Sequence, residues 1–179
     1  MDVKYAILGF LSWQPFTGYD LKKAISDSPA FYWSGNNNQI YTTLVKIHKE
    51  GLVTNEVQHQ ERYPSRKVYT ITNKGLSELR IWLASSPETP QLRKSFLVQF
   101  AWADLLSPTE LDELLEQYEY KVKMQLLMYQ EQKRRGSTIG PARTPRETYL
   151  WNMIFENHIS SFKAELAWVG RVRRELSES

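Results

Sequence analysis

The sequence predicts a mainly α-helical fold with one small β-hairpin, in which an N-terminal winged helix–turn–helix is followed by an α-helical dimerisation domain. Three observations predict this fold class. Three stretches with helical apolar spacing come first, two β-like runs follow them, and two long stretches with helical spacing fill the second half of the chain. The Ser- and Pro-containing segment 85–90 is typical of a hinge, so we expect domains at residues 1–86 and 87–179.

The first two helices are predicted from apolar spacing and from residues that begin or end helices. Asp2 is a suitable cap for a helix that runs to about Leu11. The sequence at 13–16 contains a Pro and ends this helix. Thr17 can then open a second helix, which the Ser-Pro pair at 28–29 closes.

A third helix is predicted from about Asn37 to Glu50. Ile40, Leu44 and Ile47 recur at i, i+4 and i+7, so they must face the core. The opposite stripe is polar, moderately short and almost uncharged over most of its length. It consists of Gln39, Thr42 or Thr43, and Lys46.

Beyond Gly51, which suits the end of a helix, the apolar period changes towards two. The runs LVTNEV at 52–57 and KVYTIT at 67–72 are β-like, and the segment between them carries a Pro and several charges. We therefore expect a β-hairpin with a basic tip. Thr72 can cap the following helix, NKGLSELRIWL. The basic residues near the tip are Arg62, Arg66 and Lys67.

The second half is predicted to hold one apolar helix and two long helices. The apolar helix lies around LRKSFLVQFAWADLL at 92–106. Both long helices begin with a hydroxyl residue at N-cap, Pro at N1 and Glu at N3, in the sequences SPTE at 107–110 and TPRE at 144–147. We expect the first to run to about Arg135 and the second to about Leu176.

Each long helix carries an apolar seam with near-heptad spacing. Helices of this length overhang a small domain, and a symmetric dimer is the simplest way to cover their seams. An intramolecular helical hairpin is the alternative, and both can hold, because a hairpin can bury one stripe while a dimer buries another. The seam residues are Leu111, Leu115, Tyr118, Val122 and Tyr129 in the first helix, and Trp151, Phe155, His158, Phe162, Leu166, Val169 and Leu176 in the second.

Composition and charge narrow the function classes. The absence of Cys excludes disulfides and thiolate metal sites and favours the cytoplasm, and no apolar run approaches the ~20 residues of a membrane span. The three His are scattered, and no nucleophile elbow or phosphate-binding Gly-rich loop is present, so we expect no catalysis, metal or cofactor. The net charge is +3, since residues 1–86 carry ten basic and seven acidic side chains and residues 87–179 carry thirteen of each. The positive excess therefore lies in the half where we expect a polyanion to bind.

The polar stripe of the third helix has the chemistry of a helix that reads DNA. A major groove admits one α-helix, and base edges are read by side chains that donate and accept hydrogen bonds. Gln39 can reach an adenine edge, Lys46 a guanine or a phosphate, and the Thr methyl groups a thymine methyl. The basic wing can contact phosphates or the minor groove, and Lys22 and Lys23 can contact the DNA backbone. The alternative for each of these surfaces is plain solvation.

Aromatic residues offer two interpretations. They can line a pocket for a flat ligand between the halves, or they can form core, which is the commoner role of aromatic stripes. The residues concerned are Trp33, with its neighbours Phe31 and Tyr32, and Phe96, Phe100 and Trp102.

The chain resembles the PadR family of bacterial transcriptional regulators over nearly its whole length. The resemblance is carried by YAILGFLS, GYDLKK, the region of Trp33, QIYTTL with EGLV, and KVYTITNKG leading to the WL at 82–83. FLVQFAWADLL, and AWV inside the last helix, are similar to the longer class of this family, whose C-terminal domain is helical and dimerising. Within that class the chain is similar to the phenolic-acid-responsive regulators.

The resemblance implies a homodimer that binds a palindromic double-stranded operator, and repression that a small aromatic or drug-like effector relieves. It also implies a DNA backbone contact for Tyr41, and DNA-proximal positions for Gln39 and Lys67. Asn38 stands where Ser is common in the family, and Thr42 stands where Pro is common, so the operator sequence cannot be inferred from relatives. A protein-interaction module, or a constitutive regulator without a ligand, is the alternative. The predicted DNA contacts are Asn38, Gln39, Tyr41, Thr42, Thr43, Lys46, Arg66, Lys67, Lys22 and Lys23.

Overall fold

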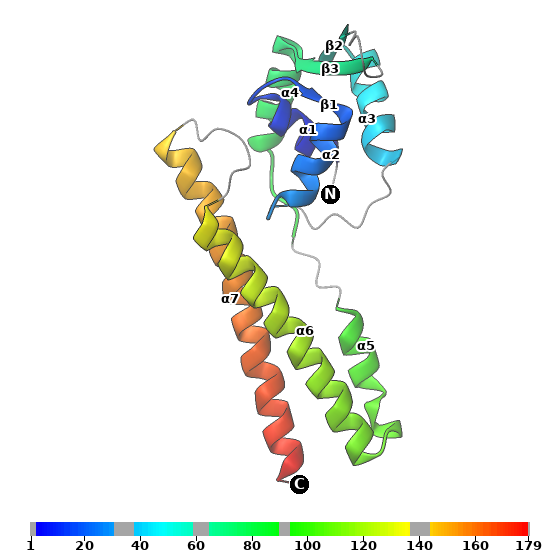
Figure 1. The fold of residues 1–179 in the computed structure, drawn as a ribbon, viewed down its shortest axis with the longest axis vertical. Coiled ribbons are helices and arrows are strands. Elements are labelled where there is room, and N and C mark those ends of the chain that lie inside the picture. The colour runs from blue at the N-terminus through cyan, green and yellow to red at the C-terminus, as the bar shows by residue number, and fades with distance from the viewer. Residues whose placement is uncertain (1–2, 31–37, 59–64, 90–93, 137–143, 179) are drawn as a thin grey trace. The chain divides into compact units, whose positions relative to one another are not determined.

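The computed structural model describes residues 3–30, 38–58, 65–89, 94–136 and 144–178. Contacts divide the chain into two compact units, which meet in the sequence after Pro87. Figure 1 shows the first unit in blue to green and the helices of the second in green to red. Among the described residues, no helix is both long enough and apolar enough to cross a lipid bilayer.

The first unit combines four helices with a three-stranded antiparallel sheet in the described ranges (Figure 1). The sheet order is β1-β3-β2, so the predicted hairpin forms and a third, short strand is added at its edge. The elements are α1 (Val3–Leu11), β1 (Phe16–Thr17), α2 (Gly18–Asp27), α3 (Asn38–Lys49), β2 (Val53–Gln58), β3 (Arg66–Ile71) and α4 (Asn73–Leu83).

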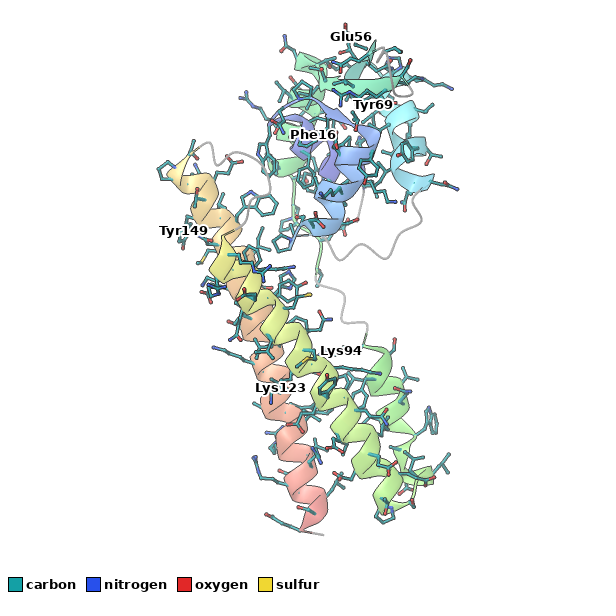
Figure 2. All side chains as sticks on the ribbon, viewed as in Figure 1. Phe16, Glu56, Tyr69, Lys94, Lys123 and Tyr149 are labelled. Carbon is teal, nitrogen blue, oxygen red and sulfur yellow. The ribbon has the colours of Figure 1, made fainter. Side chains whose placement is uncertain are left out.

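Strand β1 is the element of this unit that the sequence did not predict. It is two residues long, and its Phe16 pairs with Tyr69 of β3 (Figure 2). A run this short carries no visible alternation of apolar and polar residues, which explains why the pattern showed only the end of a helix. The main ladder runs from Val53 opposite Ile71 to Gln58 opposite Arg66.

Hydroxyl side chains begin two helices of this unit, as predicted. The Oγ1 atom of Thr17 accepts a hydrogen bond from the Asp20 amide at the start of α2, at 3.1 Å. Thr72 accepts from the Gly75 amide at the start of α4, and its hydroxyl also donates to the Leu52 carbonyl at 3.0 Å. Thr72 therefore joins the start of α4 to the start of β2.

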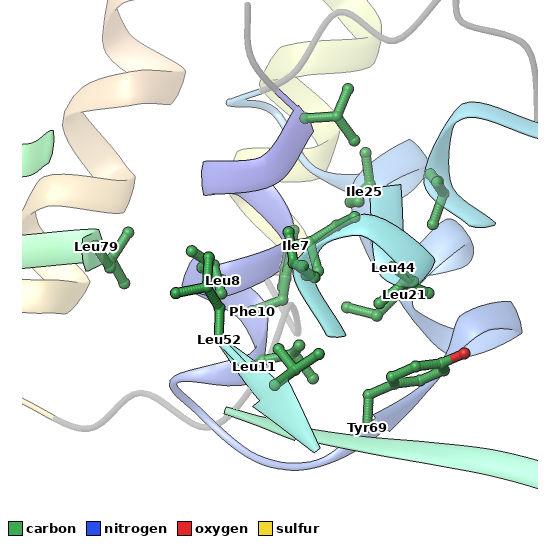
Figure 3. Close-up of a cluster of buried hydrophobic side chains, with 14 residues drawn as sticks. Ile7, Leu8, Phe10, Leu11, Leu21, Ile25, Leu44, Leu52, Tyr69 and Leu79 are labelled. Atoms are coloured by element: carbon green, nitrogen blue, oxygen red, sulfur yellow. The ribbon is translucent and has the colours of Figure 1, made fainter. Parts of the chain in front are cut away.

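The core of the first unit lies between α1, α2, α3 and the sheet (Figure 3). Gly51, at φ +73°, turns the chain from α3 into β2, which is a conformation that suits glycine. Gly75 lies against the Leu52 carbonyl so closely that no Cβ would fit there. The largest fully buried side chains are Ile7, Leu8, Leu21, Ile25, Ile40, Leu44, Ile47 and Val53.

The second unit is a long helical hairpin with a short helical segment packed on it. Its described elements are α5 (Ser95–Ala101), the 3-10 helix η1 (Ala103–Leu105), α6 (Pro108–Arg135) and α7 (Pro145–Ser177). The single apolar helix expected at 92–106 is therefore split at Trp102. Ser107 forms the predicted capping box with Glu110, and Thr144 accepts from the Glu147 amide at 3.0 Å.

Helices α6 and α7 pack against each other along their length (Figure 1). Arg173 of α7 bridges two carboxylates of α6, donating to Glu119 at 2.7 Å and to Asp112 at 3.0 Å. Near the same end, Phe96 of α5 joins Leu115 and Val169 in a buried cluster. The hairpin thus brings the two predicted seams together within one chain.

Candidate nucleic-acid interface

Helix α3 has one buried face and one exposed face. Ile40, Leu44 and Ile47 are all 0% exposed, and they hold the helix on the core of the first unit. At about 100° per residue, this buried stripe fixes which side chains point outward. The residues directly opposite recur at i, i+4, i+7 and i+11. This outer stripe consists of Asn38, Thr42, Val45 and Lys49, all of which are exposed.

The predicted DNA-contacting residues of α3 are distributed around this outer stripe. Gln39 and Lys46 are exposed on one flank of it, whereas Tyr41 is exposed on the other flank. Thr43 is half-buried beside the core face, so it contributes less exposed surface than Thr42. The structure therefore brings Asn38, Gln39, Thr42 and Lys46 onto one exposed surface.

Tyr41 has a defined place next to α2. A Cβ atom added at Gly18 would lie 2.6 Å from Cε1 of Tyr41, so the ring packs against the backbone where α2 begins. The side chain is nonetheless 46% exposed. Glycine at 18 therefore allows α2 and the Tyr41 ring to approach closely, while the rest of the ring remains accessible.

The wing carries two exposed basic side chains on β3. Arg66 pairs with Gln58 across the ladder, and its Nε donates to the Gln58 Oε1 at 3.1 Å. Lys67 pairs with Val57 and is exposed. Arg62, the other predicted wing cation, lies outside the described residues. β2 follows α3 through Gly51 and Leu52, so the wing and the exposed face of α3 belong to one continuous segment of the fold.

The two predicted cations on α2 differ in exposure. Lys23 is exposed, whereas Lys22 is half-buried because it lies closer to the face that carries Leu21 and Ile25. Tyr19 in the first turn of α2 is 68% exposed and was not predicted. That the predicted residues of α2, α3 and the wing contact DNA stays a prediction.

Val45 and Lys49 are the outer-stripe residues that sequence reasoning missed. Their signal was available, because they lie opposite Ile40, Leu44 and Ile47 in the helical period. The prediction selected polar residues by their chemistry and gave the stripe as Gln39, Thr42 or Thr43, and Lys46. Phasing the helix from its buried residues instead centres the exposed stripe on Thr42 and Val45.

The charged pair Lys4–Glu78 joins α1 to α4, with Nζ and Oε1 2.7 Å apart. The hydrogen bond from Lys4 holds the pKa of Glu78 below its ordinary value. Lys74 of α4 donates to the Glu50 carbonyl at 2.7 Å, just after the end of α3.

In the part of the chain that the structure describes, no group of three or more His, Asp or Glu side chains is arranged to hold a metal ion.

The aromatic residues predicted for an effector pocket take different positions. Phe96 is 7% exposed and stacks on Tyr118, with ring centroids 3.5 Å apart. Phe100 stacks on Phe96 and meets Trp168 edge-on, so both phenylalanines belong to the core of the second unit. Trp102 is 70% exposed, and Trp33 lies outside the described residues.

A polar group borders this aromatic core. Glu165 of α7 accepts a hydrogen bond from the Tyr118 hydroxyl at 2.6 Å and pairs with Lys94. Burial alone would raise the pKa of Glu165, but the hydrogen bonds from Lys94 and Tyr118 outweigh it and hold the pKa below its ordinary value. Burial and the contact with Glu165 raise the pKa of the Tyr118 hydroxyl. At neutral pH this group is therefore a carboxylate held by one cation and one hydroxyl.

A cavity of about 390 Å³ opens at the end of the helical hairpin where α6 begins and α7 ends. It lies between η1, the start of α6 and the end of α7, and it was not predicted. Its lining combines apolar side chains with Arg173 and two carboxylates. The apolar residues include Leu106, Leu111, Leu115 and Leu176.

The predicted dimer residues are used largely inside one chain. Leu115, Val122, Phe155 and Val169 are each 5% exposed or less, because α6 and α7 cover one another. These four side chains are not available to a second chain unless the hairpin opens. Most of the other seam residues are half-buried and can contribute at an edge: Leu111, Tyr118, Tyr129, Trp151, His158, Phe162 and Leu166. Leu176 is 45% exposed.

Comparison with known families divides the chain in the same way as its fold. Residues 7–81 match the transcriptional regulator PadR-like family, and residues 92–177 match the family described as virulence activator alpha C-term. The negative transcriptional regulator PadR of Bacillus subtilis (strain 168) is 31% identical over 115 residues, which cover 64% of this chain and 63% of that protein. The chain thus spans less than two thirds of this relative's length. The family resemblance in the sequence is confirmed.

Two solved structures of Bacillus subtilis PadR share the fold. The complex with operator DNA has a TM-score of 0.84 at 24% identity, covering 97% of this chain and 98% of that chain. The complex with p-coumaric acid has a TM-score of 0.78, also at 24% identity, with 98% of each chain covered. These likenesses confirm the predicted fold class, a winged helix–turn–helix followed by a helical C-terminal part.

Proposed function

We propose that the chain is a transcriptional regulator of the PadR-like type, a homodimer that binds double-stranded operator DNA. In this proposal α3 enters the major groove, and the wing contacts the neighbouring backbone. Transcription is repressed in the bound state, and a small aromatic effector releases the protein from its operator.

The exposed face of α3 is the observation that carries the DNA-binding proposal. Asn38 and Gln39 bring amide donors and acceptors to the first turn, and Lys46 brings a positive charge two turns later. Amide side chains suit adenine edges, and a lysine suits guanine or phosphate. The opposite face of the helix is buried in the core, so these side chains project from a packed helix.

The wing and α2 supply contacts that position the helix without reading sequence. Arg66 and Lys67 are exposed on β3, and positive side chains beside a recognition helix favour phosphate oxygens or the minor groove. Tyr41 presents its ring next to the start of α2, where we propose a phosphate contact. Lys23 is better exposed for the same purpose than Lys22.

Repression and its release are proposed from the relatives. The Bacillus subtilis relative is named a negative transcriptional regulator, and its solved structures include complexes with operator DNA and with p-coumaric acid. For this chain, the candidate site for a flat apolar ligand is the cavity lined by Leu106 and Arg173. Phe96 and Phe100 pack into the core of the second unit, which favours the core interpretation of these two aromatic residues.

The dimer proposal now rests on apolar residues that the helical hairpin leaves exposed. A surface rich in such residues is typical of a protein-interaction site. Those around α5, η1 and the middle of α6 include Leu97, Val98, Trp102, Leu105, Tyr120, Met124, Leu127 and Met128, and those on α7 include Tyr149, Leu150 and Met153.

DNA binding is tested by fluorescence anisotropy with the full chain and a duplex that it selects from a random 30-base-pair pool. We expect affinity to fall steeply as salt rises, because phosphate contacts release counterions. The double variant Gln39→Ala, Lys67→Ala should bind at least tenfold more weakly. Lys123→Ala, an exposed lysine of α6, is the control for loss of charge and should bind like the wild type. An affinity for the duplex that changes neither with salt concentration nor in the double variant would favour the protein-interaction alternative.

Effector binding is tested separately by thermal unfolding in the presence of hydroxycinnamic acids and other small aromatic compounds. A ligand that binds the native state raises the unfolding midpoint, by an amount that increases with ligand concentration. We expect at least one such compound to raise the midpoint and to lower the affinity for the selected duplex. If none does so across a broad library, the chain is a constitutive regulator.

A further inference from the structure

An apolar side chain lies in the middle of the exposed face of α3. Val45 is 53% exposed and lies opposite the buried stripe of Ile40, Leu44 and Ile47. It is one turn after Thr42 on the same outer stripe. The surface that the proposed function aims at DNA is therefore not uniformly polar.

Thr42 contributes a second apolar group next to Val45. Its hydroxyl donates to the Asn38 carbonyl at 2.9 Å and lies 3.1 Å from the Gln39 carbonyl of the same helix. This back-bonding turns the hydroxyl toward the preceding helical turn. The side chain is exposed, so its methyl group is the part left for contact with another molecule. Thr42 and Val45 together form a methyl-bearing strip, with Asn38 and Lys49 at its two ends.

Retaining such a strip has a cost in helix stability. β-Branched residues lose side-chain freedom in a helix, and Val and Thr rank well below Ala in helix propensity. An exposed Val gains little from burial in return. Its position is therefore better explained by a contact outside the chain than by the fold.

We propose that Val45 and Thr42 read the 5-methyl groups of thymine in the operator, a role that rests on the proposed DNA-binding function. In the major groove, thymine is the base that presents a methyl group, and apolar side chains recognise it by contact. Residues at i and i+3 have Cβ atoms about 5–6 Å apart, which lets the two side chains reach thymines one or two base steps apart. Asn38 and Gln39 then read the polar base edges on the N-terminal side of this strip.

The test replaces thymine by deoxyuridine, which pairs identically but lacks the methyl group. The probe is the duplex that the full chain enriches most from a random 30-base-pair pool, synthesised with deoxyuridine at one thymine at a time. We expect one or two positions in each half-site at which the replacement weakens wild-type binding about fourfold, the ratio that corresponds to one buried methyl group.

Two variants assign these positions to their side chains. Val45→Ala should bind the thymine duplex about as weakly as the wild type binds the deoxyuridine duplex, and it should lose sensitivity to the replacement at one position. Thr42→Ser keeps the hydroxyl that back-bonds and loses only the methyl, so it should lose sensitivity at the other. Lys49→Ala is the control, because a phosphate contact weakens binding to both duplexes equally. Thermal unfolding should show that Val45→Ala is at least as stable as the wild type.

The outcomes separate this role from DNA binding itself. A protein that enriches a duplex but binds its deoxyuridine forms with unchanged affinity overturns the thymine contact and leaves the proposed function standing. Val45→Ala and Thr42→Ser variants that keep full sensitivity to the replacement overturn it as well. Failure to enrich any duplex overturns the DNA-binding proposal and this role with it.

Discussion

At the scale of single residues, Thr72 shows how one hydroxyl positions two elements. It accepts from the Gly75 amide, and its one hydroxyl proton is shared between the carbonyls of Gly51 and Leu52, at 2.8 and 3.0 Å. The turn after α3, the start of β2 and the start of α4 are joined at this point. Gly75 has to be glycine here, because the Leu52 carbonyl occupies the space of a Cβ atom.

Replacing Thr72 by Val removes this hydroxyl but keeps the shape of the side chain. We expect the free energy of unfolding of the first unit to fall by about 1–2 kcal/mol, since an N-cap is lost together with a hydrogen bond to partly buried carbonyls. Thr72→Ser keeps the hydroxyl and should lose less than half as much. Urea denaturation of the two variants makes the comparison, and equal losses would show that the hydroxyl does not matter.

Glu165 gives a pH dependence with a definite sign. Its folded-state pKa is lower than its unfolded value, so it contributes stability above the unfolded pKa and loses that contribution as the pH falls through the folded pKa. We expect the unfolding midpoint of the wild type to fall on acidification below pH 5, with a shallower fall for Glu165→Gln. The comparison is made by thermal unfolding between pH 3 and pH 7. Parallel curves for the two proteins would contradict the assignment.

At the scale of elements, the helices and the hairpin could be predicted because each has a strong local signal. Buried residues at i, i+4 and i+7 predicted α3, and the Ser107-Pro108 and Thr144-Pro145 starts predicted α6 and α7. β1 was missed because a two-residue strand has no periodicity of its own, and its pairing with β3 is a long-range contact. The split of the helix at 92–106 was missed because Trp102 carries no breaker signal in the sequence.

The surfaces of these elements were harder to predict than their positions. The apolar seams of α6 and α7 were visible, but the sequence does not say whether a seam meets its own chain or another. The structure pairs them within the chain. On α3, Gln39 and Lys46 were chosen by side-chain chemistry. The outward direction became clear only when the buried residues gave the phase of the helix.

Leu115 tests the pairing of α6 with α7. It is 1% exposed in the cluster with Phe96 and Val169, so Leu115→Ala should lower the free energy of unfolding of the second unit by about 2–5 kcal/mol. Leu127 of the same helix is 47% exposed, and Leu127→Ala should change it by about 0.5 kcal/mol or less if no second chain covers that site. Similar losses for both, at a concentration that keeps the protein monomeric, would contradict the observed packing.

At the scale of the whole molecule, the two units carry different features. The first unit carries the charge excess, the wing and the exposed face of α3, and the second carries the long hairpin with its exposed apolar residues. A regulator that binds a palindrome needs two reading helices held at a fixed separation, which a symmetric dimer provides. The proposed function therefore needs both units.

The dimer is checked by light scattering with the full chain at micromolar concentration. We expect a mass twice the 21.0 kDa of one chain. Leu105→Asp introduces a charge at the most exposed large apolar side chain among the described residues, and it should shift the protein towards the monomer. Leu83→Asp, on the exposed end of α4, is a matched charge control and should leave the mass doubled. A wild-type mass of 21.0 kDa would show a monomer and contradict the proposed dimer.

Whether α3 reads base edges is tested by the ratio of specific to non-specific affinity. Fluorescence anisotropy measures the binding of the full chain to its selected duplex and to a scrambled duplex at the same salt concentration. We predict that Gln39→Ala weakens binding to the selected duplex at least fivefold and leaves binding to the scrambled duplex unchanged, which lowers the ratio. Lys67→Ala should weaken both affinities and preserve the ratio. A ratio that stays at the wild-type value in Gln39→Ala, Asn38→Ala and Thr42→Ala alike would contradict base reading by α3.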